Sequence, residues 1–80
     1  MGKVEQQLRK IPEKYSERVY AAIAKIVAHD FMTLDRRKLS ANEDIFRVRV
    51  GAYRIIYHDD GEIITFIDIV RRNEKTYRNF

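Results

Sequence analysis

Three arginines at fixed spacing around a predicted turn are the residues best suited to chemistry. Arg47 and Arg49 occupy alternate positions before the dipeptide Gly51-Ala52, and Arg54 follows it. A two-residue hairpin turn there sets Arg49 opposite Arg54 and keeps Arg47 on the same face. Opposed like charges destabilise a sheet, whereas guanidinium groups are always charged and match phosphate with two hydrogen bonds. The spacing therefore predicts a face that binds a polyanion.

Two other basic segments extend this charge. The triplet Arg36-Arg37-Lys38 precedes the hairpin, and the tail carries Arg71, Arg72, Lys75 and Arg78, interleaved with Tyr77 and Phe80. Positive charge for phosphates and rings for stacked bases suit single-stranded RNA. A plainer interpretation stays open at this point, because arginines on the open face of a sheet also occur as solvated residues that blunt its edges.

Other chemistries find little support in the sequence. His29 and His58 share no metal-ligand spacing, Ser40 has no paired base, and the three glycines are isolated rather than gathered in a phosphate-binding loop. We expect no metal and no cofactor. His58, at the end of a predicted strand, is a candidate proton acceptor.

Two helices are expected before the hairpin. Val4, Leu8 and Ile11 form one stripe at helical spacing. Pro12 ends that stripe, because the residue before a proline avoids the helical region. Apolar residues then repeat at helical spacing through a second helix, at Tyr15, Val19, Ala22, Ile23, Ile26 and Val27. The pattern predicts a helical hairpin.

Residues 30 to 44 lose periodicity, and we expect a connecting loop there. From Ile45 the pattern has period two, which predicts strands over 45–50, Tyr53–His58 and Glu62–Val70, the last two joined by a turn at 59–61. The third strand is apolar on both faces, as strands inside a sheet are, yet the chain offers it one neighbour. The expected order is α-α-β-β-β. This is an α+β fold in which an N-terminal helical hairpin packs on a small antiparallel sheet.

Length and composition limit the class of protein. Eighty residues fit a single domain covering 1–80, and 45% apolar with 35% charged residues suits a folded chain of net charge +4. The absence of cysteine excludes disulfides and thiolate metal sites. No apolar run approaches the roughly 18 residues of a membrane span, and no apolar leader follows the first residues. We expect a cytoplasmic protein with no membrane contact.

The hairpin resembles the RelE/ParE superfamily of toxins from type II toxin–antitoxin systems. The resemblance rests on Arg-Val-Arg-Val-Gly-Ala-Tyr-Arg-Ile-Ile-Tyr at 47–57, the acidic turn at 59–61, the apolar strand at 62–70 and the basic tail that leads to Tyr77. The Leu-x-x-Ile-Pro break at 8–12 also fits, so the likeness covers nearly the whole chain. Family members usually begin with a strand that joins the last strand of the sheet. This chain starts almost at the helix, which agrees with the unpartnered third strand.

The resemblance implies a RelE-like toxin that inhibits translation by cutting mRNA in the ribosomal A site. A ribose 2′-OH attacks the adjacent phosphate and leaves a cyclic phosphate and a free 5′-OH. By position, the family's catalytic residues correspond to Arg47, Arg49, Arg54, Arg72 and Tyr77. We expect further RNA contacts from Arg36, Arg37, Lys38, Arg71, Lys75 and Arg78.

Two questions stay open. RelE-like nucleases often have lysine where this chain has Arg47 and Arg49, and arginine is a poor proton acceptor. The general base is then Tyr77, His58 or a group of the ribosome. The alternatives to mRNA cleavage are the ParE branch, which inhibits DNA gyrase, and a catalytically inactive module that only binds its antitoxin.

The resemblance also implies partners. These are a cognate antitoxin protein, the ribosome and mRNA. The antitoxin supplies the DNA contacts that repress the operon, so we expect no sequence-specific DNA binding by this chain without it.

Overall fold

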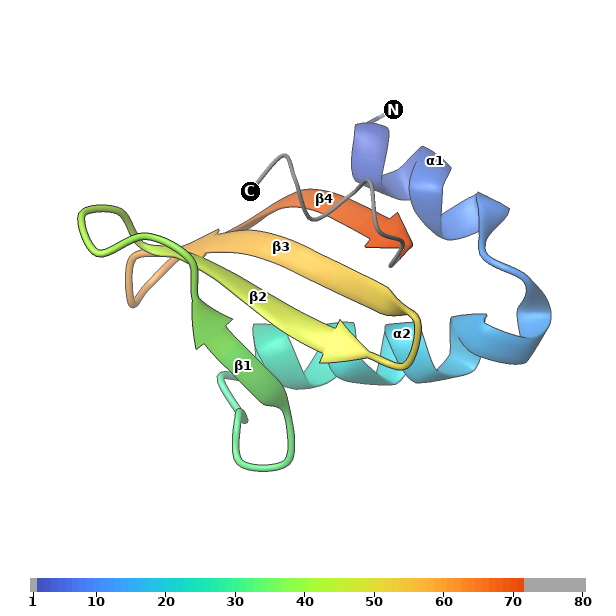
Figure 1. Ribbon diagram of the computed structural model, residues 1–80, viewed down its shortest axis with the longest axis horizontal. Helices are drawn as coiled ribbons and strands as arrows, with labels where there is room; N and C mark the ends of the chain where they lie inside the picture. Colours follow the sequence, from blue (N-terminus) through green and yellow to red (C-terminus); the bar gives the residue numbers. More distant parts are fainter. Residues whose placement is uncertain (1, 72–80) are drawn as a thin grey trace.

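Two helices precede a four-stranded antiparallel sheet in the computed structural model, which describes residues 2–71 (Figure 1). The strands follow one another across the sheet in chain order, β1-β2-β3-β4. The elements are α1 (Lys3–Lys10), α2 (Glu13–Val27), β1 (Asp35–Lys38), β2 (Ile45–Val50), β3 (Tyr53–Asp59) and β4 (Ile64–Arg71). The predicted α+β class and the order of its helices and strands are confirmed, with one additional strand.

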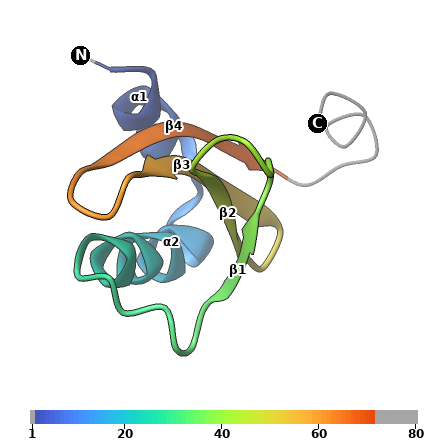
Figure 2. The same ribbon diagram turned by 90° about the vertical axis from the view of Figure 1, so that its left-hand side faces the viewer.

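The helices break where the sequence predicts. Ile11 has extended backbone angles, φ −72° and ψ 125°, as a residue before proline should. Helix α2 lies across one face of the sheet, whereas α1 lies beside β4 (Figure 2). Each helix therefore packs chiefly on the sheet, and the two lie at different parts of it.

The core lies between α2 and the sheet. Val19 and Ile26 of α2 are fully buried against Val48, Ile55 and Tyr57 of the two central strands. Each such side chain stabilises the fold by roughly 1.5–3 kcal/mol relative to exposure. This burial fixes which face of β2 and β3 looks inward, because alternate residues of a strand point to opposite faces.

The central hairpin has the predicted register. Val50 pairs with Tyr53, Arg49 with Arg54, and Val48 with Ile55. The turn needs a glycine, since Gly51 has φ +57°, in the left-handed region that other residues adopt only at a cost.

The loop predicted for residues 30 to 44 is wrong over four residues, because Asp35–Lys38 forms β1 and pairs with β2. All four residues are charged, so no apolar alternation marks the strand. Backbone pairing with β2 makes it a strand, and its short, charged sequence suits a sheet edge.

The last strand differs in detail from the expectation. A bulge between Ile56 and Tyr57 of β3 and their partners places Phe66 opposite Tyr57 and Asp68 opposite Ile56. Ile67 falls at the irregularity and is 41% exposed, so the predicted apolar alternation along both faces does not hold.

Within residues 2–71, β4 has a strand neighbour on one side, as predicted. Helix α1 borders its other edge. The carboxamide of Gln7 accepts a hydrogen bond from the backbone N–H of Ile69 at 2.9 Å and donates one to Asp68 at 2.5 Å. The Gln7 side chain thus binds a backbone group of β4 that a neighbouring strand would otherwise pair with.

Candidate nucleic-acid interface

The register gathers four arginines on the sheet face opposite α2. Arg49 stands directly opposite Arg54 across β2 and β3, and Arg37 stands directly opposite Arg47 across β1 and β2. We call Arg37, Arg47, Arg49 and Arg54 the arginine face. Three of these residues were predicted to share a face, and β1 adds the fourth.

The charge on this face is incompletely balanced. Arg47 is largely buried, with 14% of its side chain exposed, and its Nη1 atom makes no hydrogen bond within the described part of the chain. The nearest carboxylate is that of Asp35, whose Oδ2 lies 3.9 Å from Nη1. That distance permits attraction but no hydrogen bond. Within the described residues, the charge of this buried guanidinium is therefore only partly compensated.

A second carboxylate on the same face is already engaged. Asp68 lies across β3 from the arginines, in the row that contains Arg37, Arg47 and Ile56. It accepts a hydrogen bond from Gln7, and its Oδ2 lies 3.4 Å from Nζ of Lys3. The Asp68 carboxylate is thus bound by two side chains of α1 beside β4.

The basic triplet splits between the two faces of the sheet. Arg37 joins the arginine face, whereas Arg36 lies on the core side, opposite Val48. The Arg36 guanidinium stacks on the rings of Phe31 and Phe46, with its central carbon 3.9 and 3.7 Å from their centroids. Its position separates this predicted RNA contact from Arg37, which lies on the opposite face.

Hydrogen bonds hold Arg36 in place. Its Nε donates to the Tyr57 hydroxyl at 2.6 Å, and its Nη2 lies 3.4 Å from the buried carboxylate of Asp59. Burial raises the pKa of Tyr57 above its ordinary value of 10.0, although Arg36 opposes the shift. His29, which also lies 3.4 Å from Asp59, completes a cluster that the sequence did not reveal, because its members are far apart in the chain.

Two other predicted RNA contacts also leave the arginine face. Lys38 pairs with Phe46 in a core-side row and lies 3.9 Å from Asp44. Arg71 stands opposite Tyr53 at the end of β4, in another core-side row. Arg72, Lys75, Tyr77 and Arg78 lie outside the described residues.

His58 keeps its place as a candidate proton acceptor. It follows Arg54 and Ile56 at alternate positions of β3, so all three point to the same face. The row containing His58 adjoins the row containing Arg47. Arginines for a phosphate and an imidazole for a proton therefore share one surface.

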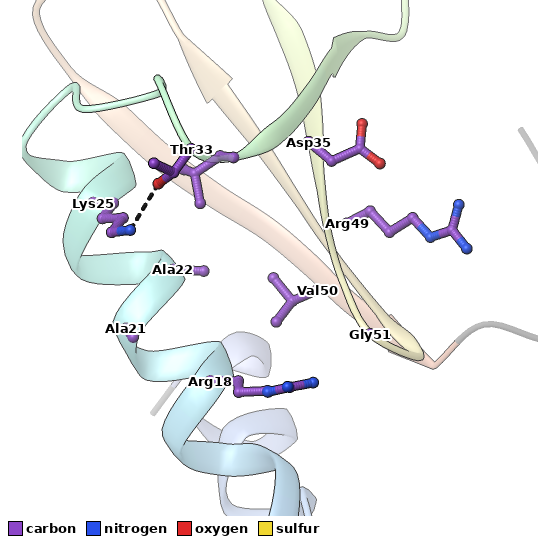
Figure 3. Close-up of a pocket in the computed structure, with 10 residues that line it drawn as sticks. Arg18, Ala21, Ala22, Lys25, Thr33, Asp35, Arg49, Val50 and Gly51 are labelled. Carbon is purple, nitrogen blue, oxygen red and sulfur yellow. Dashed lines mark hydrogen bonds between the residues drawn. The ribbon is translucent and has the colours of Figure 1, made fainter.

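A groove opens on the other side of the sheet, between α2 and the end of the hairpin (Figure 3). Its volume is about 440 Å³. Alanines of α2 and Val50 line its apolar part, and Arg18 and Lys25 bring positive charge, whereas the side chain of Arg49 points away from α2 (Figure 3). Lys25 donates a hydrogen bond to the Thr33 hydroxyl at 2.7 Å, which ties α2 to the loop before β1.

Comparison of the sequence with protein-family models identifies the family. Residues 1–76 match the family model for the ParE toxin of the type II toxin–antitoxin system, parDE. The chain belongs to the ParE/RelE family of toxins. No curated protein sequence gives a significant match.

The fold has a solved counterpart. The chain is similar to one in the crystal structure of the RelB–RelE antitoxin–toxin complex from Methanococcus jannaschii, with a TM-score of 0.79 and 23% sequence identity. The match covers 100% of this toxin and 95% of that chain. At this identity the likeness shows a shared fold. In the part of the toxin that the structure describes, no helix is long and apolar enough to cross a membrane.

Proposed function

We propose that this toxin inhibits translation by cutting mRNA in the ribosomal A site, with the arginine face as its phosphate-binding surface. The observation that carries the proposal is the cross-strand opposition of Arg49 to Arg54 and of Arg37 to Arg47. Opposed guanidiniums destabilise a sheet unless an anion lies between them, and phosphate is an anion that their forked donors fit with two hydrogen bonds.

The cleavage step follows from the residues on this face. The ribose 2′ oxygen attacks the adjacent phosphorus, the bond from phosphorus to the 5′ oxygen breaks, and the released 5′ oxygen takes a proton from water, so that a 2′,3′-cyclic phosphate and a 5′-OH remain. Arg49 and Arg54 stabilise the negative charge that develops on the phosphorane. His58 takes the proton of the attacking 2′-OH, since imidazole is the commonest general base in proteins. Arg72 and Tyr77 of the tail remain predicted catalytic residues, with Tyr77 orienting the nucleotide.

The partner follows from the family. The structural counterpart was crystallised as an antitoxin–toxin complex, which supports a cognate antitoxin for this chain. We propose that an acidic antitoxin covers part of the arginine face and supplies the DNA contacts of the complex. The toxin alone then has no sequence-specific affinity for DNA.

A cell-free translation reaction with a defined mRNA, mapped by primer extension, tests the proposal. Cuts inside codons are expected only when ribosomes are present. Arg54→Gln should slow cutting by about 10²–10³-fold, as loss of a donor to a developing oxyanion does. Arg9→Gln, which removes the same charge from the exposed face of α1, is the matched control. Uncut mRNA at full translation, or equal cutting by both variants, would refute the assignment.

Inhibition of DNA gyrase is the second candidate, and the family model that names ParE favours it. A supercoiling assay with purified gyrase separates the two functions. Inhibited supercoiling with intact mRNA would assign the toxin to the ParE branch. Activity in neither assay, combined with tight antitoxin binding, would identify an inactive binding module.

A further inference from the structure

The arginine face continues into a row of different chemistry at the end of the sheet away from Gly51. Leu39 donates its backbone N–H to the carbonyl of Ile45 at 2.8 Å, which extends the register of β1 and β2 by one pair. Ile45 in turn stands opposite His58 across β2 and β3. Because alternate residues of a strand share a face, Leu39 and Ile45 lie on the same side of the sheet as Arg37 and Arg47. We call Leu39 and Ile45 the aliphatic pair.

The aliphatic pair lies outside the hydrophobic core. Leu39 is 42% exposed, Ile45 is partly buried, and neither belongs to the apolar cluster that packs between α2 and the sheet. Single exposed leucines are common on protein surfaces, so exposure alone indicates nothing. The neighbours of this leucine are what distinguish it, since the isoleucine and His58 adjoin it on the surface that we propose for phosphate.

Charge changes sign across the aliphatic pair. The arginine face lies on one side of it. On the other side, the loop between β1 and β2 and the turn between β3 and β4 lie at the same end of the sheet (Figure 1). They carry the exposed residues Glu43, Asp44, Asp60 and Glu62, of which Asp44 lies 3.9 Å from Lys38. These carboxylates repel phosphate, so the aliphatic pair suits an uncharged part of a ligand whose phosphate lies on the arginines.

A nucleotide of single-stranded RNA has this distribution of charge, because one ribose joins an anionic phosphate to a base with two apolar faces. The aliphatic pair lies two residues along the strands from Arg37 and Arg47, which is about 7 Å. Directly opposed side chains such as those of Leu39 and Ile45 are about 5 Å apart at Cβ, so together they offer a surface comparable in width to one base.

We propose that Leu39 and Ile45 form a platform for one unpaired RNA base, next to a phosphate on the arginine face. The ribose between them then lies at the junction of Ile45 and His58, which directs its 2′-OH toward the imidazole. Leu39 and Ile45 position the substrate and take no part in proton transfer. This inference deepens the proposed function and rests on it.

Fluorescence anisotropy of the full chain with two labelled strands tests the platform. One strand is a uridine dodecamer, and the other carries the same number of phosphates on abasic tetrahydrofuran units. The wild type should bind the uridine strand about fivefold more tightly or better, because the base buries apolar surface. The salt dependence of the two affinities should be equal, since the base adds no charge. Equal affinity for the two strands would overturn the platform.

Matched variants separate the platform from any other contact to a base. Leu39→Ser should reduce the preference for the uridine strand to about twofold or less. Val27→Ser shortens a 59%-exposed side chain on α2, which lies on the other side of the sheet, and should keep the preference of the wild type (Figure 2). Urea unfolding checks that both variants fold, as their exposed positions predict. Equal preferences in the two variants would contradict the assignment of Leu39.

Methyl NMR locates the base directly. The ring current of a stacked adenine should move the methyl signals of Leu39 and Ile45 upfield when the ¹³C-labelled chain binds an adenosine dodecamer. The methyl signals of Val27 should stay in place. Bound RNA that leaves the signals of both Leu39 and Ile45 unshifted would overturn the proposal.

The same measurements separate the failure of the platform from the failure of the proposed function. Salt-dependent binding with no difference between the two strands would support the phosphate-binding surface and overturn the platform alone. A base preference that depends on Leu39, together with intact mRNA in the translation reaction, would support the platform and refute the proposed cleavage. Failure of either strand to bind would overturn both.

Discussion

Adjacent residues Arg36 and Arg37 should respond to the same substitution in opposite ways. Strand alternation sends Arg37 to the arginine face, whereas Arg36 stacks between Phe31 and Phe46 on the core side. Arg37→Gln should weaken RNA binding and leave stability nearly unchanged. Arg36→Gln should destabilise the fold and leave the electrostatic part of RNA binding intact.

The size of each effect follows from the contacts. Each arginine that neutralises a phosphate of single-stranded RNA contributes about −0.7 to the slope of log K against log salt. Four arginines on four phosphates give about −2.8, which is roughly a 50-fold loss of affinity between 50 and 200 mM salt. Without Arg37 the slope falls to about −2.1 and the loss to roughly 20-fold.

Arg36 contributes to the free energy of unfolding through its buried partners. Arg36→Gln removes the hydrogen bond to Tyr57 and leaves the Asp59 carboxylate, which is 7% exposed, without this cation. A quarter of the Arg36 side chain is exposed, so the cost is less than for a fully buried pair. We expect about 2 kcal/mol in the free energy of unfolding.

Fluorescence anisotropy with a labelled uridine dodecamer at several salt concentrations measures the slope, and urea unfolding measures the stability. The slope suits this comparison because partial unfolding lowers the apparent affinity without changing the number of phosphates contacted. A reduced slope for Arg36→Gln, together with an unchanged slope for Arg37→Gln, would refute the assignment of the two residues to opposite faces.

Three further substitutions test other parts of the structure. Burial raises the pKa of Tyr57, so the unfolded chain loses that proton first as pH rises. The wild type should therefore lose stability above about pH 10, and Tyr57→Phe should lose less, as measured by urea unfolding across the alkaline range. Gly51→Ala should cost about 1 kcal/mol in the same assay, because φ is +57° and an added methyl group meets no atom within 4 Å. Arg49→Thr should raise the unfolding free energy at low salt by about 0.5 kcal/mol, since it ends the opposition to Arg54, while RNA binding weakens. A loss of stability in Arg49→Thr would show that the arginines carry no electrostatic strain.

The sequence predicts the parts of the fold that depend on local pattern. The break at Pro12 and the turn at Gly51 each follow from the backbone preferences of one residue. The opposition of Arg49 to Arg54 then follows from the length of the turn alone. These local rules were sufficient to place three of the four arginines on one face.

The remaining features depend on contacts between distant residues. Strand β1 has no apolar alternation, because the stacked guanidinium of Arg36 takes the place of an aliphatic side chain on the core side. The bulge that displaces Ile67 arises from pairing between β3 and β4. The cluster of His29, Arg36 and Asp59 joins three segments of the chain. Patterns among residues that are neighbours in the sequence do not predict such contacts.

The core and the arginine face are two sides of the same strands, which makes the geometry of one dependent on the other. Val48 and Tyr57 are fully buried against α2 at positions next to Arg47 and His58. A slip of β2 by one residue would put arginines into the core, at a far greater cost than the opposition of like charges on the surface. Burial of the valine and the tyrosine therefore holds the arginines in an arrangement that their own charges disfavour. The hydrophobic core thus supplies the energy that keeps positive charge concentrated on this face of the sheet.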